Sequence, residues 1–172
     1  MSAFFVSPGS QGVEFARECS EQVEYALYRQ CGSLQETELH LYVLDIIHNH
    51  MMGNFGKVWG LTASAWRLMV GLQLCWEGRP GLKRDFRDEE ISRRLAWLVF
   101  HLDRIVAGGF DAHVCCREEH MQVQLPCPEQ NFNEGREILV ERLSDNTVKG
   151  KSNLGFHGYM VRLMSIRHHV LT

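Results

Sequence analysis

The stretch "ISRRLAWLVFHLDRIVAGGFD", Ile91 to Asp111, decides the fold class because its hydrophobic residues recur with the period of an α-helix. On a helical wheel they form one broad core face within roughly 120°, made of Ile91, Leu95, Leu98, Val99, Leu102, Ile105 and Val106. The opposite side carries Trp97 and Phe100 together with Arg93, Arg94, His101 and Arg104. The sequence therefore predicts a helix that packs against more than one neighbour and ends at Gly108 and Gly109.

The charged residues of this helix raise the question of whether they perform chemistry or hold the fold together. Arg93, Arg94 and Arg104 share the side of Trp97, and Asp103 lies between that side and the predicted core face. Buried charges need partners, and arginine stems cover aromatic rings well. We therefore predict a salt-bridged structural helix in preference to a ligand or DNA-phosphate contact, because no basic patch surrounds these arginines.

Three more helices are predicted before this one. A first amphipathic helix stops near Gly32, and Ser33 with Glu36 matches the capping box S-x-x-E that would open a second, closed by Gly53. The third covers residues 56–74 and is apolar all round, which predicts that it is buried. Asp88 is the expected N-cap of the fourth helix.

The pattern weakens after the fourth helix. A short helix is expected around Arg117–Met121, a proline-bracketed turn at Leu125–Glu129 and a weak helical signal at Ile138–Leu143. A last helix, Leu154–Leu171, has apolar residues in helical register, namely Phe156, Met160, Leu163, Ile166 and Val170. We expect an all-α fold, a multi-helix bundle of stacked antiparallel helices with a long irregular connection before the last helix, formed by residues 1–172 as a single domain.

Composition excludes several function classes. The 172 residues are 45% hydrophobic and 23% charged, with a formal net charge of −3, so nothing attracts nucleic acid globally. The longest uncharged apolar stretch, Leu68–Trp76, is far below the roughly 20 residues that cross a bilayer, so no membrane partner is expected. Six cysteines without an export signal favour reduced thiols over disulfides.

Residues of metal-binding type occur together only in "HVCCREEH", which holds His113, Cys115, Cys116 and His120. Adjacent cysteines splay apart, so a turn with incidental thiols is favoured over a zinc site. The pairs His48 with His50 and His168 with His169 lack the i, i+4 spacing of helical metal ligands, which favours surface or partly buried histidines.

Catalytic motifs are missing from the sequence. It contains neither G-x-S-x-G nor GxxxxGK[ST], and the pairs Glu89-Glu90 and Glu118-Glu119 are typical of solvated faces. We therefore predict no catalytic, metal-binding or DNA-binding residue, no cofactor in this chain, and a protein that is not an enzyme.

Three motifs in order resemble a known family. The segment from Glu89 to Phe132 contains an "E..RR..W..F..D" helix followed by an "LPC.E..F" turn, carried by Glu90, Arg93, Arg94, Trp97, Phe100, Asp103, Leu125, Pro126, Cys127, Glu129 and Phe132. Upstream, Trp59, Gly60, Ala65, Arg67 and Leu72 are similar to "W.l.g.A.R.a..L.L", and the last helix is similar to "Y..rl..ir..vl". From about Leu34 to Leu171 the chain resembles the fungal-specific transcription factor domain, or middle homology region.

The resemblance implies an all-helical regulatory domain of a nuclear protein that controls transcription by RNA polymerase II. In the family this domain follows a zinc-finger or binuclear zinc-cluster DNA-binding module, so zinc and DNA contacts are implied only for that module. This sequence contains no C-x2-C-x6-C cluster and no C-x2-4-C…H-x3-5-H finger. We therefore expect a truncated domain or a degenerate paralogue, without sequence-specific DNA affinity of its own.

The leading hypothesis is a regulatory and interaction domain whose partners are other transcription proteins or a second copy. The alternative is a helical domain that senses a small-molecule effector, since tryptophan- and methionine-rich helix interfaces form apolar pockets. An enzyme ranks third, and a folded remnant without independent function is also open. Target genes, effector, oligomeric state and activation versus repression do not follow from the sequence.

Overall fold

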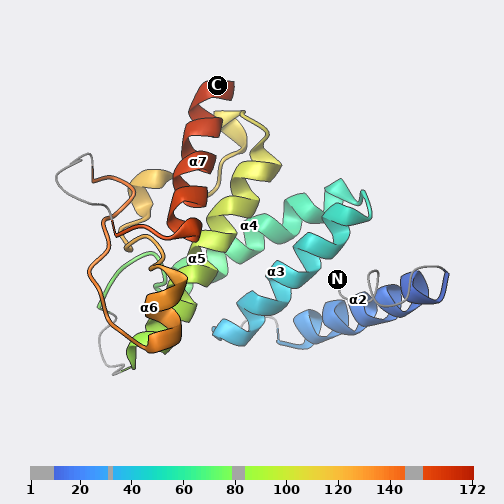
Figure 1. Ribbon diagram of the computed structural model, residues 1–172. Coiled ribbons are helices and arrows are strands. Elements are labelled where there is room, and N and C mark those ends of the chain that lie inside the picture. The colour runs from blue at the N-terminus through green and yellow to red at the C-terminus, as the bar shows by residue number, and fades with distance from the viewer. Residues whose placement is uncertain (1–9, 31–32, 79–83, 146–152) are drawn as a thin grey trace. The chain divides into compact units, whose positions relative to one another are not determined.

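The computed structural model describes residues 10–30, 33–78, 84–145 and 153–172 (Figure 1). The chain divides into two compact units, Met1–Ala65 and Trp66–Thr172, and each is described by itself. The expected single domain over residues 1–172 stays a prediction. Within the described ranges, no helix is both long and apolar enough to cross a membrane.

The first unit contains α2 (Ser10–Gln30), α3 (Glu36–Met51) and the start of α4 (Phe55–Gly71). Helices α2 and α3 pack against each other, and their buried apolar side chains are Ala16, Leu27, Leu39, Val43 and Ile46. One polar contact also joins the two helices, because the Ser20 hydroxyl donates to Asp45 at 3.3 Å. The expected end of the first helix near Gly32 lies outside the described residues.

The predicted capping residues are wrong at two helices. Helix α3 begins at Glu36 with Gln35 as N-cap and without a side-chain cap, and the Ser33 hydroxyl donates to Glu38 at 3.2 Å instead. Helix α5 (Phe86–Ala107) has Asp85 as its N-cap, whose carboxylate accepts from the backbone N–H of Asp88 at 2.8 Å. The N-cap is the residue with extended backbone just outside the helix, which the spacing of motifs does not locate.

The expectation that the third helix is buried all round is also wrong. Within the first unit, α4 buries Val58, Thr62 and Ala65 on one stripe, whereas Phe55 is 64% and Trp59 is 46% exposed. The apolar content of this helix therefore exceeds what its own unit covers.

The second unit is organised around α5 and α7 (Phe156–Leu171), which pack against each other and run in the same general direction (Figure 1). The stacked antiparallel arrangement expected from the sequence does not apply to this pair, because the long connection returns the chain to the start of α5. Their last turns meet closely. A Cβ added to Gly109, at φ +93°, would lie 2.6 Å from Cβ of Leu171, so both the backbone and the space require glycine there.

The long irregular connection before the last helix is confirmed. It contains two single-turn 3₁₀ helices, η1 (Asp111–His113) and η2 (Glu118–His120), and the short helix α6 (Glu129–Glu134). The short helix expected around Arg117–Met121 is therefore correct, whereas the helical signal at Ile138–Leu143 is wrong. That segment is extended and forms an isolated bridge between Gln124 and Arg142. No strand is assigned elsewhere in the described ranges, and the all-α class is confirmed.

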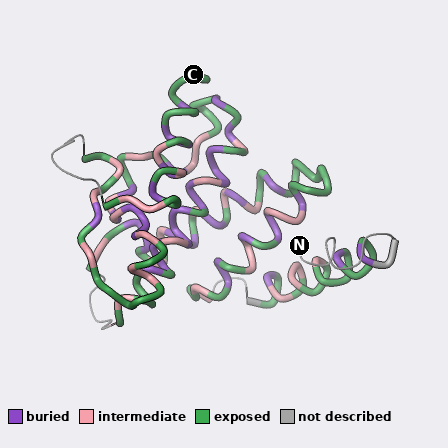
Figure 2. The backbone as a smooth tube through the Cα atoms, viewed as in Figure 1, coloured by how far each residue is buried: buried purple, intermediate pink, exposed green. Residues whose placement is uncertain are grey.

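The face of α5 that the structure buries is not the predicted one. Ile91, Leu98 and Ile105 are 39–42% exposed, although Leu95, Val99 and Leu102 are buried as expected. Much of α5 is buried (Figure 2). Its buried polar and aromatic residues are Glu90, Ser92, Arg93, Trp97, Phe100, Asp103 and Arg104.

Helix α7 shows the same inversion. The predicted apolar register is exposed at Phe156, Leu163, Ile166 and Val170, whereas the buried residues are Gly158, Val161, Met164, Ser165 and His168. In both helices a row of apolar residues faces outward, and polar side chains take part in the interior.

Candidate functional site

The first half of α5 and two neighbouring loop residues form a group of buried and half-buried side chains, here called the polar clamp: Glu77, Glu90, Arg93, Arg94, Trp97 and Gln124. At its centre is the carboxylate of Glu90, which is fully buried. Its Oε1 accepts from the backbone N–H of Cys127 at 2.9 Å and from Nε of Arg94 at 3.0 Å. Its Oε2 accepts from Arg93. One carboxylate thus compensates two arginines and an amide, which is how a buried charge is tolerated.

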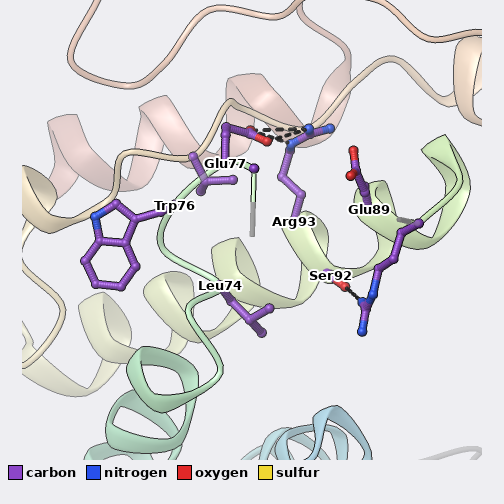
Figure 3. A pocket seen from close by; sticks show the side chains of 9 residues that line it. Leu74, Trp76, Glu77, Glu89, Ser92 and Arg93 are labelled. Carbon is purple, nitrogen blue, oxygen red and sulfur yellow. Dashed lines mark hydrogen bonds and ion pairs between the residues drawn. The ribbon is translucent and has the colours of Figure 1, made fainter. Parts of the chain in front are cut away.

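Arg93 extends the clamp to the loop before α5. Its guanidinium lies 3.3 Å from the carboxylate of Glu77, and Figure 3 shows these two side chains facing each other. Glu77 in turn accepts from the backbone N–H of Gln124 at 2.8 Å. The backbone carbonyl of Gln124 then accepts from Nε1 of Trp97 at 2.6 Å. The backbone of Gln124 is therefore held at two points, by Glu77 and by Trp97 of α5.

The clamp also reaches α6 through Arg94. Its Nη1 lies 2.9 Å from Glu129, and its guanidinium carbon lies 4.2 Å from the ring centre of Phe132. The structure therefore brings the two halves of the sequence signature together. Within the second half, Leu125, Pro126 and Cys127 are buried. Glu77 and Gln124 were not found from the sequence, since neither belongs to a recognisable motif.

Asp103, the last signature residue of α5, serves a different part of the connection. Its carboxylate accepts from the backbone N–H groups of Cys115 at 3.1 Å and Cys116 at 3.0 Å. Arg104 donates to it at 3.1 Å, and the Arg104 guanidinium lies 4.4 Å from the ring centre of Phe100. Burial raises the pKa of Asp103, although these donors oppose that effect. These contacts place the arginines and Asp103 in ion pairs and set two arginines against aromatic rings, and the structural role expected of them stays a prediction.

A cavity beside the clamp is too small for a ligand. It is lined by Leu74, Trp76, Glu77, Glu89, Ser92 and Arg93, among others (Figure 3). Its volume is about 30 Å³, which is room for only a few water molecules. The clamp is therefore a packed structural unit rather than a binding cleft.

A larger cavity of about 250 Å³ lies at the other end of α5. Its lining residues come from α5, the η1–η2 region and α7, and they are Arg104, Asp111, Val114, Arg117, Glu118, Glu119, His168 and His169. The expectation of a surface or partly buried histidine is wrong for His168, which is 4% exposed and lies 3.0 Å from Asp111. The sequence did not predict that Arg104, Glu118 and His168 lie close together, because three separate segments supply them.

The thiols of this unit are held in their protonated form. Burial, together with the nearby carboxylate of Glu90, raises the pKa of Cys127 to about 11. Burial also raises the pKa of Cys75 to about 12 and that of Cys116 well above its ordinary value. Among the side chains that the structure describes, no three His, Cys, Asp or Glu residues are placed to hold one metal ion.

These contacts define a helical domain whose most distinctive polar residues pair with one another and with backbone N–H groups. A family model described as the fungal specific transcription factor domain matches residues 42–172. The chain belongs to this family, as the resemblance of its motifs predicted, and the family is one of transcription factors rather than enzymes.

Proteins similar to this chain are also named as fungal transcription factors. The Zn(2)-C6 fungal-type transcription factor FTF1c of Fusarium oxysporum f. sp. lycopersici is 29% identical over 136 residues, which cover 68% of this chain and 15% of that protein. FTF1a and FTF2 of the same organism are 38% and 37% identical over 79 residues, covering 41% of this chain and 8% and 7% of those proteins. The chain thus spans a small part of these relatives. No solved structure matches it.

Proposed function

We propose that this chain is a regulatory and interaction domain that takes part in transcription by RNA polymerase II in the nucleus. The observation that carries the proposal is the family match over residues 42–172. The relatives are named as Zn(2)-C6 transcription factors, so DNA contacts and zinc are proposed for a separate module in the longer proteins.

The site geometry supports regulation through surface contacts. The charged signature residues of α5 already have partners inside the domain. Glu90, Arg93 and Arg94 pair within the polar clamp, and Asp103 accepts from backbone N–H groups. They are therefore unavailable for a partner protein. Helix α7, by contrast, exposes apolar side chains in one helical register at Phe156, Leu163, Ile166 and Val170. Apolar surface of this kind is typical of protein–protein contacts. Other transcription proteins are the proposed partners, and a second copy of the chain is the rival.

A reporter assay tests the proposal. The 172-residue chain is fused to a heterologous DNA-binding module in yeast, and expression of an RNA polymerase II reporter is measured. We expect the fusion to change reporter output relative to the module alone. The double variant Leu163→Asp with Ile166→Asp should abolish that change, because both side chains are more than half exposed and charge opposes apolar docking.

The matched control is Arg167→Ala. Arg167 is exposed and belongs neither to the outward apolar row of α7 nor to its buried row. It should leave reporter output unchanged, and immunoblots should show equal amounts of all fusions. A fusion that alters no reporter would contradict the proposed function. Light scattering of the purified chain distinguishes a second copy from a different partner.

A further inference from the structure

The contact between α2 and α3 contains a buried carboxylate whose two oxygens differ in their partners. Asp45 of α3 is 2% exposed. Its Oδ1 accepts from the Ser20 hydroxyl of α2 at 3.3 Å and from Nδ2 of Asn49 at 2.8 Å. Its Oδ2 is buried as well and has no hydrogen-bond partner. An ionised carboxylate here leaves one charged oxygen uncompensated, which is costly in a protein interior.

Charged groups approach Asp45 from α2, α3 and α4. Glu24 of α2 is a second carboxylate and opposes the ionisation of Asp45, whereas Lys57 of α4 and His48 of α3 favour it. The charge of Lys57 is shared, because its Nζ lies 2.5 Å from Oε1 of Glu24. Both side chains of this ion pair are at least 40% exposed, which weakens its effect. Burial first, and Glu24 second, raise the pKa of Asp45 above its ordinary 3.8.

The inner face of α2 offers little apolar surface to offset this cost. Among the residues of the helix whose burial is described, the buried ones are Gly12, Ala16 and Leu27, of which only leucine is large. Tyr25 and Tyr28 are 58% and 83% exposed and add little to the contact. Helix packing is stabilised mainly by buried apolar area. One uncompensated charge is therefore large in comparison with what holds α2 in place.

We propose that Asp45 makes α2 a detachable helix: α2 docks on α3 while Oδ2 of Asp45 carries a proton, and it is released when Asp45 is ionised beside Glu24. The proton removes the charge that Oδ2 cannot compensate, and Ser20 and Asn49 still donate to Oδ1. On ionisation the proton passes to solvent water, and two charged carboxylates then share one helix contact.

The pH dependence of docking follows from the raised pKa of Asp45. The docked state binds the proton of Asp45 more tightly than the released state, in which the side chain is solvated and titrates near its ordinary 3.8. The stability that protonated Asp45 gives to docking is fully present below pH 3.8 and is lost as the pH rises through the raised pKa. Docking of α2 should therefore weaken as the pH rises.

This inference goes beyond the proposed function and does not rest on it. A helix that docks and detaches gives the chain two states, and a partner that binds one of them better shifts the balance between them. Docking is measured on the purified chain without a reporter, so a silent reporter fusion and a permanently docked α2 are separate results.

The test is amide hydrogen exchange of the 172-residue chain, followed by mass spectrometry between about pH 4 and about pH 8 and corrected for the intrinsic exchange rate at each pH. In wild type, protection of residues 10–30 should fall as the pH rises, while protection of α5 reports global unfolding. Asp45→Asn places a neutral amide where the protonated carboxyl stands. Its α2 should keep a flat profile and, at about pH 8, protection about tenfold or more above wild type. Parallel α2 profiles in the two proteins would overturn the proposal.

Ser20→Ala is a second variant, which keeps the carboxylate and removes one donor to Oδ1. This donor matters most for the ionised form, so protection of α2 should fall severalfold at about pH 8 and less at about pH 4. The control is Glu18→Gln, which removes the same charge from an exposed position of α2 and should follow wild type. A flat profile in Glu18→Gln, or equal losses in Ser20→Ala at both pH values, would refute the role of Asp45. Circular dichroism confirms that all three variants are folded.

Discussion

The two ends of α5 solve the problem of buried charge differently. At the first end, both oxygens of Glu90 accept hydrogen bonds, and the arginines beside it are shared with Glu77 and Glu129. At the second end, Arg104 pairs with Asp103, yet its Nε and the facing atoms of Glu118 and His168 have no hydrogen-bond partner. The first arrangement satisfies its buried polar atoms, whereas the second leaves three of them without a hydrogen-bond partner.

This difference between the two ends of α5 bears on how much each end contributes to stability. A fully satisfied polar network fixes one conformation and offers nothing to a solute. A network that leaves buried donors and acceptors unpaired costs stability instead. The comparison predicts that substitutions at the first end destabilise the chain more than those at the second.

The largest effect is expected for Glu90→Ala. Its removal takes an acceptor from Arg93, Arg94 and the Cys127 amide, and only the two arginines keep another carboxylate, at Glu77 and Glu129. Breaking a buried pair from one side costs about 3–5 kcal/mol, and three lost donors place this variant near the upper value. Urea unfolding followed by circular dichroism measures the change.

The control for Glu90→Ala is Glu89→Ala, the exposed neighbour in the first turn. Its free energy of unfolding should stay within about 0.5 kcal/mol of wild type. Equal losses in the two variants would show that the polar clamp does not carry the stability assigned to it.

A slightly smaller effect is expected for Trp97→Ala. The side chain is 1% exposed and donates to the backbone carbonyl of Gln124. Truncating a buried tryptophan costs about 3–5 kcal/mol, measured as a lower melting temperature and urea midpoint. Trp97→Phe keeps most of the volume and should cost about 1–3 kcal/mol for the unpaired carbonyl. An unchanged melting temperature of Trp97→Ala would place this face of α5 at the surface.

At the second end, Arg104→Leu should cost only about 1–2 kcal/mol. Asp103 keeps two backbone N–H donors, and leucine removes the desolvation of the unpaired Nε. Chemical unfolding under the same conditions as for Glu90→Ala gives the comparison directly. A loss as large as that of Glu90→Ala would mean that the two ends are equally structural.

The helices could be predicted from the sequence, but the pairing of the signature residues with the irregular connection and the buried faces of α5 and α7 could not. Hydrophobic periodicity finds a helix from its repeat, and it assigns the apolar side to the core. Here Ile91, Leu98 and Ile105 are exposed, because the opposite side is covered by the irregular connection. Buried polar residues such as Glu90 and Asp103 are compensated by backbone N–H groups of Cys127 and Cys116, far away in sequence.

The cavity residues were missed for a related reason. Glu118 belongs to an acidic pair and His168 to a histidine pair, and both patterns are typical of solvated faces. Neither pattern contains the distance to Arg104, which depends on how α5, η2 and α7 meet. Backbone partners and contacts among three segments are tertiary facts, and local spacing does not encode them.

His101 lies between the two ends and should give a smaller, pH-dependent effect. Burial lowers the pKa of His101 from its ordinary 6.5. Below pH 6.5 the unfolded chain therefore binds a proton at this residue more readily than the folded chain does. The stability that depends on neutral His101 is fully present above pH 6.5 and is lost as the pH falls through the lowered pKa. His101→Gln should flatten the fall in unfolding free energy between about pH 7 and about pH 5. Parallel pH profiles of wild type and variant would exclude this source.

The smallest effect is expected on the outward row of α5, at Leu98→Ala. Leu98 is 39% exposed, so its truncation removes little buried surface and should cost less than about 1 kcal/mol. Leu95→Ala is the matched control, because Leu95 is 5% exposed and should lose about 2–5 kcal/mol. Both leucines belong to the core face that periodicity assigned to this helix. Equal losses of unfolding free energy in the two variants would support the core face predicted from periodicity. A much larger loss for Leu95→Ala would support the burial of α5 that the structure shows.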